Sequence, residues 1–587
     1  MYSFDKFFEE AKRYKKELIY ANVLALLAVI VSTPAPLVMP VLVDEVLLKK
    51  PGIVTNSIDA FFGHPSTAYV YVGIMLVLVI LLRALYFILN YYQTKLFTVV
   101  SKNISFKLRE DLLKHLSCVA INELEFFGSG KSASLMVVDV DTIENFLGSF
   151  VSRLIISVLT IIGVGIVLLM IQWKLALFIL FLNPFVVVLT TKIAKKVSVL
   201  KREQNRAFEV FQESLSETLE LFSQVRAANQ DKNFFSRVIT SAKEIKNKSI
   251  EFTYKSDGAS RLSFLVFLSG FEVFRAASIL VVAYSDLTIG LMLGIFGYLW
   301  VMMNPIQDIL NIQYAYQNAR KSLQRINSIF ALRCEPQYKH KYNPFVKNPT
   351  NKIEVKNLTF AYEDEKNILQ NINLKIRRGM KIAIVGASGS GKTTLANLLV
   401  GLYAFEKGDI LYDDCSIKDI GLDVVRDHVY LVLQNPQMFN DTIRANLTFG
   451  EKVDDEKLYK ALEIAQLGGF IEELKNGLDT QIGRNGVKLS GGQRQRISIA
   501  RMIVQNPNIV ILDESTSALD VHTENRLFES LNDYLKDKTT IIIAHRLSTI
   551  RKADYIYVLD HGVIEEEGTH DELMSLEGTF YSYTKGV

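Results

Sequence analysis

The first half of the chain is organised as long apolar stretches separated by polar ones. A stretch of about 20 apolar residues is the length of helix that crosses the roughly 30 Å hydrocarbon core of a membrane. Six stretches reach that length, and we expect six membrane-spanning helices, at Leu18–Val43, Ala68–Leu96, Phe150–Ile171, Leu175–Ala194, Leu262–Tyr284 and Leu287–Ile312.

The connections between these spans alternate in length. About 53 residues follow the second span and about 67 follow the fourth, whereas spans three and four, and spans five and six, are joined by only a few residues. Apolar residues continue at helical spacing from the spans into the long connections. A helix over 68–116 would be about 70 Å long. We therefore expect helical stalks that extend far beyond the membrane, with a turn at 126–130.

Basic residues gather on the side of the long connections, and this indicates an orientation. By the positive-inside tendency that side is cytosolic, and an even number of spans then puts both termini in the cytosol. The basic residues are Lys12, Arg13, Lys15, Lys16, Lys102, Lys107, Arg109, Lys114, Lys192, Lys195, Lys196, Lys201 and Arg202.

Composition changes near residue 350. The chain has 587 residues, 49% of them hydrophobic, and its net charge of +4 combines two unlike parts. Residues 1–350 hold 38 Lys+Arg and 27 Asp+Glu, net +11, whereas residues 351–587 hold 28 and 35, net −7. We expect a transmembrane domain over 1–336, a linker over 337–352 and a second domain over 353–587. These features exclude a small secreted module, a collagen-like chain and a disordered chain.

The three cysteines, Cys118, Cys334 and Cys415, are too few and too far apart for a disulfide scaffold. Their spacing also lacks the pattern of a metal site. We therefore expect free thiols in a reducing compartment.

The second domain carries a phosphate-binding motif in its proper context. The apolar strand 381–385 leads into the pattern G-x-x-x-x-G-K-[ST], and a helix over 394–400 follows. Glycines let backbone N–H groups wrap phosphates, and the helix N-terminus adds positive potential. The residues expected to hold ATP and Mg²⁺ here are Gly386, Ser388, Gly389, Ser390, Gly391, Lys392, Thr393 and Thr394, with Thr393 on the ion.

A second apolar run, 509–512, ends in Asp513-Glu514. A carboxylate at the end of a parallel strand beside the phosphate loop can bind Mg²⁺, and its neighbour can accept a proton from attacking water. We assign the first role to Asp513 and the second to Glu514.

A third motif lies between these two. Leu489-Ser490-Gly491-Gly492-Gln493 precedes Arg494-Gln495-Arg496 and an apolar helix. It resembles the signature sequence of ATP-binding-cassette (ABC) ATPases, and almost the whole chain resembles an ABC exporter half-transporter. The resemblance implies an α-helical transmembrane domain of six spans fused to an α/β P-loop nucleotide-binding domain that hydrolyses ATP.

The resemblance also implies roles for single residues. Tyr362 stands where the family stacks an aromatic ring on adenine. Gln434, after the strand 429–433, resembles the Q-loop glutamine that contacts Mg²⁺. The segment Ser517–Asp520 resembles the D-loop, and His545 resembles the switch histidine that contacts the γ-phosphate.

In the family, the signature residues contact the γ-phosphate held by a second domain. The residues that match are Ser490, Gly491, Gly492 and Gln493, with Asp520 in the adjoining D-loop. One chain has one such domain, so it has to dimerise. The complete set of motifs favours a homodimer over a heterodimer.

One position departs from the family pattern. Exporters commonly carry a glutamate in the glycine-flanked segment before the signature, and here Arg484 stands in that segment. Either Arg484 is a solvated surface residue, or it pairs with an acid of the first long connection such as Glu123 or Glu125.

Charged residues inside the spans are candidates for substrate contact, because burying a charge in a membrane is costly. Arg83 lies inside span two, and Glu272 and Arg275 lie on one face of span five, where they either pair with each other or meet cargo. Arg83 either faces cargo or pairs across helices. Arg153 can reach an interface.

The segments Leu82-Arg83-Ala84 and Phe439–Ile443 resemble the bacterial lipid A flippases, whereas Asn304 and Gln307 depart from them. We expect ATP-driven export or flipping of an amphipathic substrate across the bacterial inner membrane, with a lipopolysaccharide precursor first and a drug or peptide second. An ATP-gated channel or regulatory subunit and an importer stay open. We expect no nucleic-acid partner, since a DNA-associated ATPase of this type would lack membrane spans.

Overall fold

The computed structural model describes residues 1–50, 52–63, 68–348, 350–362, 367–516, 518–544 and 550–585, and the chain divides into two compact units. The first, here the helical unit, comprises Met1–Lys114 and Gly130–Ala331. The second, here the sheet unit, comprises His115–Ser129 and Leu332–Val587. The connection after the second span therefore contributes a segment to the sheet unit. The domain boundaries expected from the sequence stay a prediction.

Long α-helices make up the helical unit. The first predicted span is interrupted around Pro34, Pro36 and Pro40, where a 3₁₀ turn and then a π-helical segment replace regular α-helix. The helices are α1 (Phe4–Lys12), α2 (Lys15–Ser32), α3 (Val38–Pro40), α4 (Ile53–Phe62), α5 (Ala68–Leu116), α7 (Ser129–Ser134), α8 (Val140–Asn145), α9 (Val151–Ile171), α10 (Trp173–Glu220), α11 (Phe222–Ala227), α12 (Asp231–Ala283) and α13 (Ile289–Phe330).

Within the described residues, five helical segments are long and apolar enough to cross a membrane. They are Lys15–Leu47, Ala68–Leu116, Ser129–Ile171, Asp231–Ala283 and Ile289–Ile309. These correspond to predicted spans one, two, three, five and six. The fourth predicted span lies in α10, and most of its side chains between residues 179 and 198 are outside the described residues.

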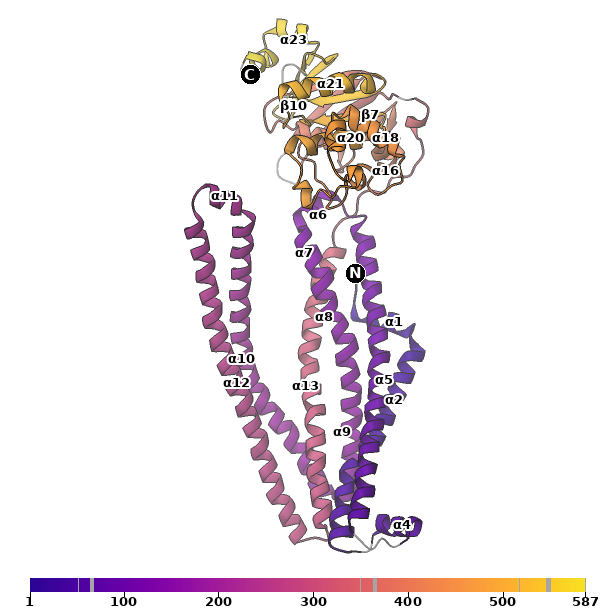
Figure 1. Cartoon of the computed structure of the whole chain (residues 1–587), viewed down its shortest axis with the longest axis vertical. Helices are drawn as coiled ribbons and strands as arrows, with labels where there is room; N and C mark the ends of the chain where they lie inside the picture. Colours follow the sequence, from indigo (N-terminus) through magenta and orange to yellow (C-terminus); the bar gives the residue numbers. More distant parts are fainter. Residues whose placement is uncertain are drawn as a thin grey trace. The chain divides into compact units, whose positions relative to one another are not determined.

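The expected stalks are present as continuous helices. Helix α5 runs over all 49 residues from Ala68 to Leu116, and Gly128, with φ of 87°, ends α6 (Ile121–Phe127) at the predicted turn. Helices α10 and α12 run side by side and are joined through α11 (Figure 1). Gln204 of α10 donates a hydrogen bond to Ser249 of α12 at 2.9 Å.

Polar contacts join distant helices inside the helical unit. The Oγ of Ser152 donates to the fully buried Gln93 at 3.0 Å. Ser157 donates to Asp308 Oδ2 at 2.9 Å, so that an acid of predicted span six is bonded to span three. Side chains with partners of this kind fix the relative rotation of helices that apolar packing alone leaves free to slide.

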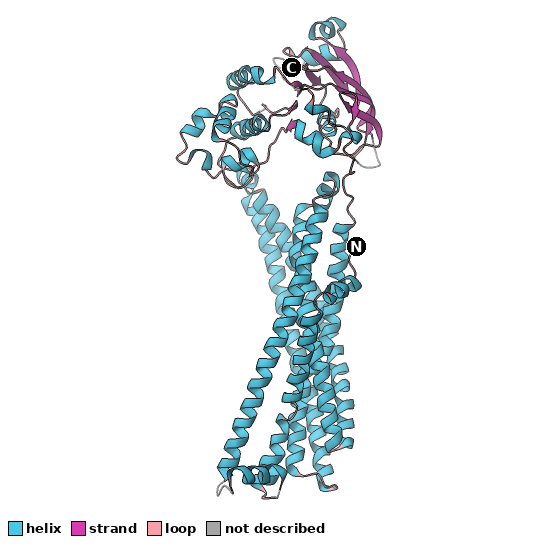
Figure 2. Ribbon diagram, turned by 90° about the vertical axis from the view of Figure 1, so that its right-hand side faces the viewer, coloured by secondary structure: helices cyan, strands magenta, loops and turns pink. Residues whose placement is uncertain are grey.

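The sheet unit contains two sheets, shown as arrows in Figure 2. The smaller has the order β2-β1-β4-β5 and is antiparallel; the larger has the order β10-β9-β3-β8-β7-β6. The strands are β1 (Ile353–Phe360), β2 (Leu369–Ile376), β3 (Lys381–Val385), β4 (Lys407–Tyr412), β5 (Cys415–Ser416), β6 (Val429–Val432), β7 (Ile509–Asp513), β8 (Thr539–Ile543), β9 (Tyr555–Asp560) and β10 (Val563–Gly568).

In the larger sheet, strands β6, β7, β8, β3 and β9 run parallel to one another, and β10 pairs antiparallel with β9 at the edge. Helices pack around the sheets, and the strand interiors are buried, which is why these strands have continuous Ile, Val and Leu runs. The helices are α6, α14 (Lys392–Leu399), α15 (Ile417–Ile420), α16 (Leu422–His428), α17 (Ile443–Thr448), α18 (Asp455–Ile464), α19 (Gly468–Glu472), α20 (Gly491–Gln505), α21 (Val521–Leu535), α23 (His570–Leu576) and α24 (Thr579–Lys585).

The segment 337–352 is partly built into this unit. Phe345 is buried, and its ring stacks on the ring of His428 with the centroids 4.8 Å apart. The centroid of the Tyr412 ring lies 5.4 Å from that of Phe345. An apolar side chain in a polar stretch therefore anchors the start of the sheet unit.

The expectation of three free thiols is wrong for two of them. Cys118 and Cys334 form a disulfide across a sequence separation of 216 residues, whereas Cys415 is free. The reason is a short strand-like pairing of their two segments: Ala120 N donates to Arg333 O at 2.9 Å, and Glu335 N donates to Cys118 O at 2.7 Å. Spacing along the chain gives no sign of this pairing.

Candidate functional site

The loop between β3 and α14 has the backbone conformation that a phosphate cradle needs. Gly386, Gly389 and Gly391 have φ values of 152°, 81° and 105°, which only glycine adopts without strain. A Cβ at Gly386 would collide with the carbonyl oxygen of Leu559, and one at Gly391 would lie 2.7 Å from Leu369 Cδ2. Gly391 is also the N-cap of α14, so the unpaired N–H groups of the first helical turn follow directly on the loop.

Lys392 is buried inside this loop. Its Nζ donates to the carbonyl oxygens of Gly386 at 3.0 Å and Ala387 at 2.8 Å. Burial lowers the pKa of Lys392, and the carboxylates of Glu514 and Asp513 oppose that shift. The ammonium group of Lys392 therefore lies beside the backbone N–H groups at the start of α14, so both kinds of hydrogen-bond donor are at the same place.

A buried hydroxyl supports an anionic ligand here. Ser390 is 4% exposed, and its Oγ has no hydrogen-bond partner within the described part of the chain. An unmade hydrogen bond of a buried polar group is costly. A group with several anionic oxygens, such as a nucleotide phosphate, would satisfy it, whereas Ser388 and Thr393 of the same loop are exposed to solvent.

An aromatic cluster lies beside the loop. The hydroxyls of Tyr362 and Thr394 are 3.0 Å apart, which links the tyrosine to the first turn of α14. The Tyr362 ring meets Phe360 and Tyr403 edge to face, with centroids 5.0 and 5.1 Å away. Because 37% of Tyr362 stays exposed, ring surface is accessible to a planar base.

Two carboxylates and an amide come from the ends of neighbouring parallel strands. Asp513 ends β7 and is 3% exposed, and Glu514 follows with φ of 42°, a strained conformation for a residue with a side chain. Gln434 follows β6, and its Nε2 donates to Glu514 Oε2 at 2.6 Å. Three of the residues expected to act on Mg²⁺ or water are thus brought to one sheet edge.

Two further predicted positions cannot be placed. His545, which follows β8, and Ser517 of the D-loop segment both lie outside the described residues. Strand β8 itself lies between β3 and β7 in the sheet order, so the chain leaves β8 at the same edge as the phosphate loop and Asp513.

The signature segment forms the N-terminus of α20. Ser490 is the N-cap: its Oγ accepts from Gln493 N at 3.1 Å, while Gln493 Oε1 accepts from Ser490 N at 2.7 Å. A Cβ at Gly492 would lie 2.8 Å from Leu519 Cδ2, so the glycine permits close packing of the D-loop. Asp520 caps the next helix, α21, through a 2.9 Å hydrogen bond from Thr523 N, and hydrogen bonds from the side chain and then the backbone of Thr523 lower the pKa of its carboxyl.

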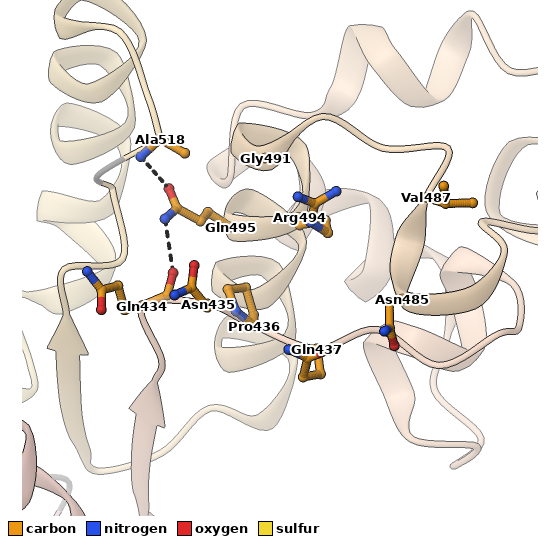
Figure 3. A pocket seen from close by; sticks show the side chains of 10 residues that line it. All are labelled: Gln434, Asn435, Pro436, Gln437, Asn485, Val487, Gly491, Arg494, Gln495 and Ala518. Carbon is orange, nitrogen blue, oxygen red and sulfur yellow. Dashed lines mark hydrogen bonds between the residues drawn. The ribbon is translucent and has the colours of Figure 1, made fainter. Parts of the chain in front are cut away.

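Gln495 joins these elements, and its role has no counterpart in the sequence motifs. It is 4% exposed; its Nε2 donates to Gln434 O at 3.1 Å and its Oε1 accepts from Ala518 N at 3.1 Å. Figure 3 shows both bonds beside a cavity of about 500 Å³. The side chains around that cavity are Gln434, Asn435, Pro436, Gln437, Asn485, Val487, Gly491, Arg494, Gln495 and Ala518.

The first-connection acids expected near Arg484 have other partners. Glu125 of α6 accepts a hydrogen bond from Tyr403 at 3.2 Å, and Glu123 lies 3.9 Å from Arg333. The Arg484 side chain is outside the described residues, so its pairing stays a prediction. Tyr403 thus contacts both Tyr362 and the segment that follows α5, a link that the motifs did not indicate.

The charges inside the predicted spans behave differently from one another. Glu272 and Arg275 of α12 form an ion pair at 2.5 Å. Arg83 and Arg153 are exposed on α5 and α9, and the described residues contain no ion pair to either. Asp308 was missed as a charge within span six, although it lies inside the predicted span, four residues before its end at Ile312.

Known protein families match both units. The family model described as ABC transporter transmembrane region matches residues 18–306, and the one described as ABC transporter matches residues 369–517. An ATP-dependent lipid A-core flippase of Legionella pneumophila (strain Paris) is 31% identical over 492 residues, which is 82% of each chain. The chain belongs to the ABC transporter family. It is an ATP-hydrolysing transporter that binds ATP.

Other relatives extend over nearly all of the transporter. A Bacillus subtilis (strain 168) protein named "Putative multidrug export ATP-binding/permease protein YgaD" is 29% identical over 579 residues, covering 98% of this chain and 97% of the relative. The structure of a bacterial Atm1-family ABC exporter with ATP bound superimposes with a TM-score of 0.79 at 23% identity, over 97% of this chain and 98% of that one. The transporter therefore has the exporter fold, an integral-membrane helical unit fused to an ABC domain, as the sequence predicted.

Proposed function

We propose that the transporter is a homodimeric ATP-driven flippase that moves an amphipathic lipid of the lipopolysaccharide-precursor class across the bacterial inner membrane. The observation that carries this is the similarity to lipid A-core flippases along most of the chain, 31% over 82% of it in one case and 29% over 94% in another. The exporter fold supports alternating access, in which closure of two ABC domains draws the stalks together.

The sheet unit supplies the ATPase site. Lys392, Ser390 and the loop amides bind the phosphates, and the accessible ring surface of Tyr362 receives the adenine. Thr393, Asp513 and Gln434 hold Mg²⁺, which when bound neutralises charge on the phosphate oxygens. Glu514, oriented by the hydrogen bond from Gln434, accepts the proton of the attacking water, and His545 contacts the γ-phosphate.

Dimerisation completes the site. Ser490 to Gln493 stand at an exposed helix N-terminus, where a second copy can present its nucleotide, and Asp520 lies in the adjoining loop. A heterodimer is the alternative. Both termini lie in the cytosol, and the chain divides into a transmembrane domain over 1–336, a linker over 337–352 and an ABC domain over 353–587.

Arg83 is the charge we assign to the anionic head group of the lipid. It is exposed on α5, whereas Glu272 and Arg275 neutralise each other as a pair and contribute less to binding. Multidrug export is the second candidate, favoured by the Bacillus subtilis relative that covers 98% of the chain.

The test is transport by the purified dimer in liposomes. A fluorescent lipid with a phosphorylated sugar head group is placed in the leaflet that carries the ABC domains, and its ATP-dependent protection from a quencher is followed. Glu514→Gln is the inactive control, and a set of cationic drugs and peptides is run in parallel.

We expect lipid flipping that requires ATP and that falls about 10–100-fold with Arg83→Ala, because a charge-assisted contact contributes about 1.5–3 kcal/mol. If the drugs stimulated ATPase activity and the lipid did not, multidrug export would replace lipid flipping as the proposed function. Flipping equal in Arg83→Ala and in the unmodified protein would remove Arg83 from the substrate site.

A further inference from the structure

Three side chains of types that can bind metals meet at the start of the sheet unit, and none of them belongs to the nucleotide-binding motifs. His115 lies in the last turn of α5, Cys118 lies just after it, and Cys334 follows α13. Their ligand atoms all lie within 4.8 Å of one another. The strand-like hydrogen bonds at Ala120 and Glu335 hold the two segments together, and the Cα atoms of the cysteines are 4.9 Å apart. The cluster is therefore built on fixed backbone.

The imidazole of His115 has the orientation of a metal ligand. Its Nε2 lies 3.2 Å from the carbonyl oxygen of Leu332. A carbonyl oxygen can only accept, so Nε2 carries the proton and Nδ1 carries the lone pair. Nδ1 lies 3.9 Å from Cys334 Sγ. Metal-binding histidines commonly donate their second N–H to a carbonyl or carboxylate in this way, which fixes both tautomer and ring orientation.

We propose that, when Cys118 and Cys334 are reduced, their thiolates and His115 Nδ1 bind one thiophilic divalent cation of the zinc class. Two thiolates and an imidazole select zinc over magnesium or calcium, which prefer oxygen ligands. Around tetrahedral zinc, neighbouring sulfur and nitrogen ligands lie about 3.5–3.8 Å apart. The distance of 3.9 Å between His115 Nδ1 and Cys334 Sγ is close to this range. Once the disulfide is reduced, rotation of the two cysteine side chains can bring their sulfur atoms to a similar separation.

Metal binding requires that the Cys118–Cys334 disulfide is first reduced. A dithiol reductant gives two electrons and two protons to the Cys118–Cys334 disulfide, which yields two thiols, and the reductant leaves as its cyclic disulfide. Metal binding then displaces the two thiol protons. Because Cys334 is exposed, the fourth position on the metal is open to water.

The site would fasten two segments that lead from membrane helices into the sheet unit. Next to it, Arg426 binds Glu335 through two hydrogen bonds of 2.9 and 3.0 Å. The residue after Cys334 is thus tied to α16 of the ABC domain. The disulfide and the proposed metal ion would link the same two segments in alternative ways. Oxidised Cys118 and Cys334 form the disulfide, and the reduced cysteines would bind the metal.

Cobalt binding to the full-length protein tests the proposal. The transporter is reduced, freed of metal and reductant without air, and titrated with Co²⁺, whose thiolate charge-transfer and d–d absorption report tetrahedral sulfur ligation. We expect saturation at one Co²⁺ per chain and displacement by Zn²⁺. Cys118→Ser and Cys334→Ser should each bind Co²⁺ more weakly and lose at least half of the charge-transfer intensity, because one thiolate is left. His115→Gln should also bind more weakly, and Cys415→Ser, the matched control, should bind like the unmodified chain.

A measurement on the unmodified protein keeps the test decisive even where a variant fails to fold. Zn²⁺ should slow alkylation of Cys118 and Cys334 by iodoacetamide and leave the rate at Cys415 unchanged, and protein oxidised to the disulfide should bind neither metal. A reduced protein without a thiolate-to-cobalt band, a band of undiminished intensity in Cys118→Ser, or alkylation rates that do not change with Zn²⁺ would each overturn the proposal.

Discussion

The two units hold their polar groups in apolar surroundings by different means. In the sheet unit, the site residues stand at strand ends and helix N-termini, where backbone geometry positions them: Lys392 at the start of α14, Asp513 at the end of β7 and Ser490 at the start of α20. In the helical unit, polar groups are held by side chains of other helices, as in Ser152 with Gln93 and Ser157 with Asp308.

This difference explains why one unit is more easily interpreted than the other. A residue positioned by its own backbone lies in a short recognisable segment, whereas a residue positioned by another helix has its partner far along the chain. Mutations should follow the same division, with large losses of catalysis in the sheet unit and smaller losses of stability in the helical unit.

The largest effect is expected for Glu514→Gln. The amide keeps the size of the side chain and can still accept the hydrogen bond from Gln434, but it cannot take the proton from water. We expect the ATPase kcat to fall by about 10²–10⁴-fold, with ATP binding retained in a fluorescent-nucleotide assay. Activity within a factor of three of the unmodified transporter would remove Glu514 as the base.

Lys392→Ala should come next, and its effect should be on ATP affinity. The ammonium group lies within hydrogen-bond distance of the loop carbonyls and inside the cradle. Loss of a charge-assisted contact to phosphate should weaken ATP binding by about 10–100-fold. Lys356→Ala, an exposed lysine of β1, is the control and should bind ATP normally.

Gln495→Leu tests whether a residue outside the recognised motifs belongs to the site. It removes the two hydrogen bonds that connect the segment at Gln434 with that at Ala518, and we expect kcat to fall about tenfold, in keeping with the loss of about 1.4 kcal/mol of positioning. Gln505→Leu, at the exposed end of the same helix, is the matched control. Equal kcat values for the two variants would show that the bridge is only structural.

In the helical unit, Asp139→Asn should lower stability and leave ATPase chemistry unchanged. Asp139 is 4% exposed and binds Arg325 of α13 through two hydrogen bonds, one of them 3.1 Å long. Because the arginine is half exposed, we expect a loss of only about 1 kcal/mol, measured as a lower unfolding midpoint in detergent. Asp141→Asn, at an exposed acid two residues on, should unfold at the normal midpoint; a kcat reduced in Asp139→Asn alone would contradict the division between the units.

Local sequence patterns predict much of this transporter. Apolar stretches and their helical continuation give α5 to its last residue, and the glycines around Lys392 give a loop whose positive φ values the structure confirms. The contacts of Gln495 and the meeting of Cys118 with Cys334 could not be obtained that way, because the partners are separated by up to 216 residues and only the fold brings them together. Asp308 illustrates the same point, since its importance depends on Ser157 of another helix.

The capping box of α20, in which Ser490 and Gln493 bond each other, has a consequence for how the proposed homodimer would open. The backbone N–H of Ser490 already donates to Gln493 Oε1, whereas the Ser490 Oγ accepts from Gln493 N and does not use its own O–H in the pair. A ligand oxygen that accepts from the Ser490 backbone N–H therefore exchanges one hydrogen bond for another, and an exchange of this kind changes the free energy by only about 1 kcal/mol. In the proposed homodimer, separation of the two copies would let the bond from Ser490 N–H to Gln493 re-form, so the signature helix would release a ligand as readily as it binds one.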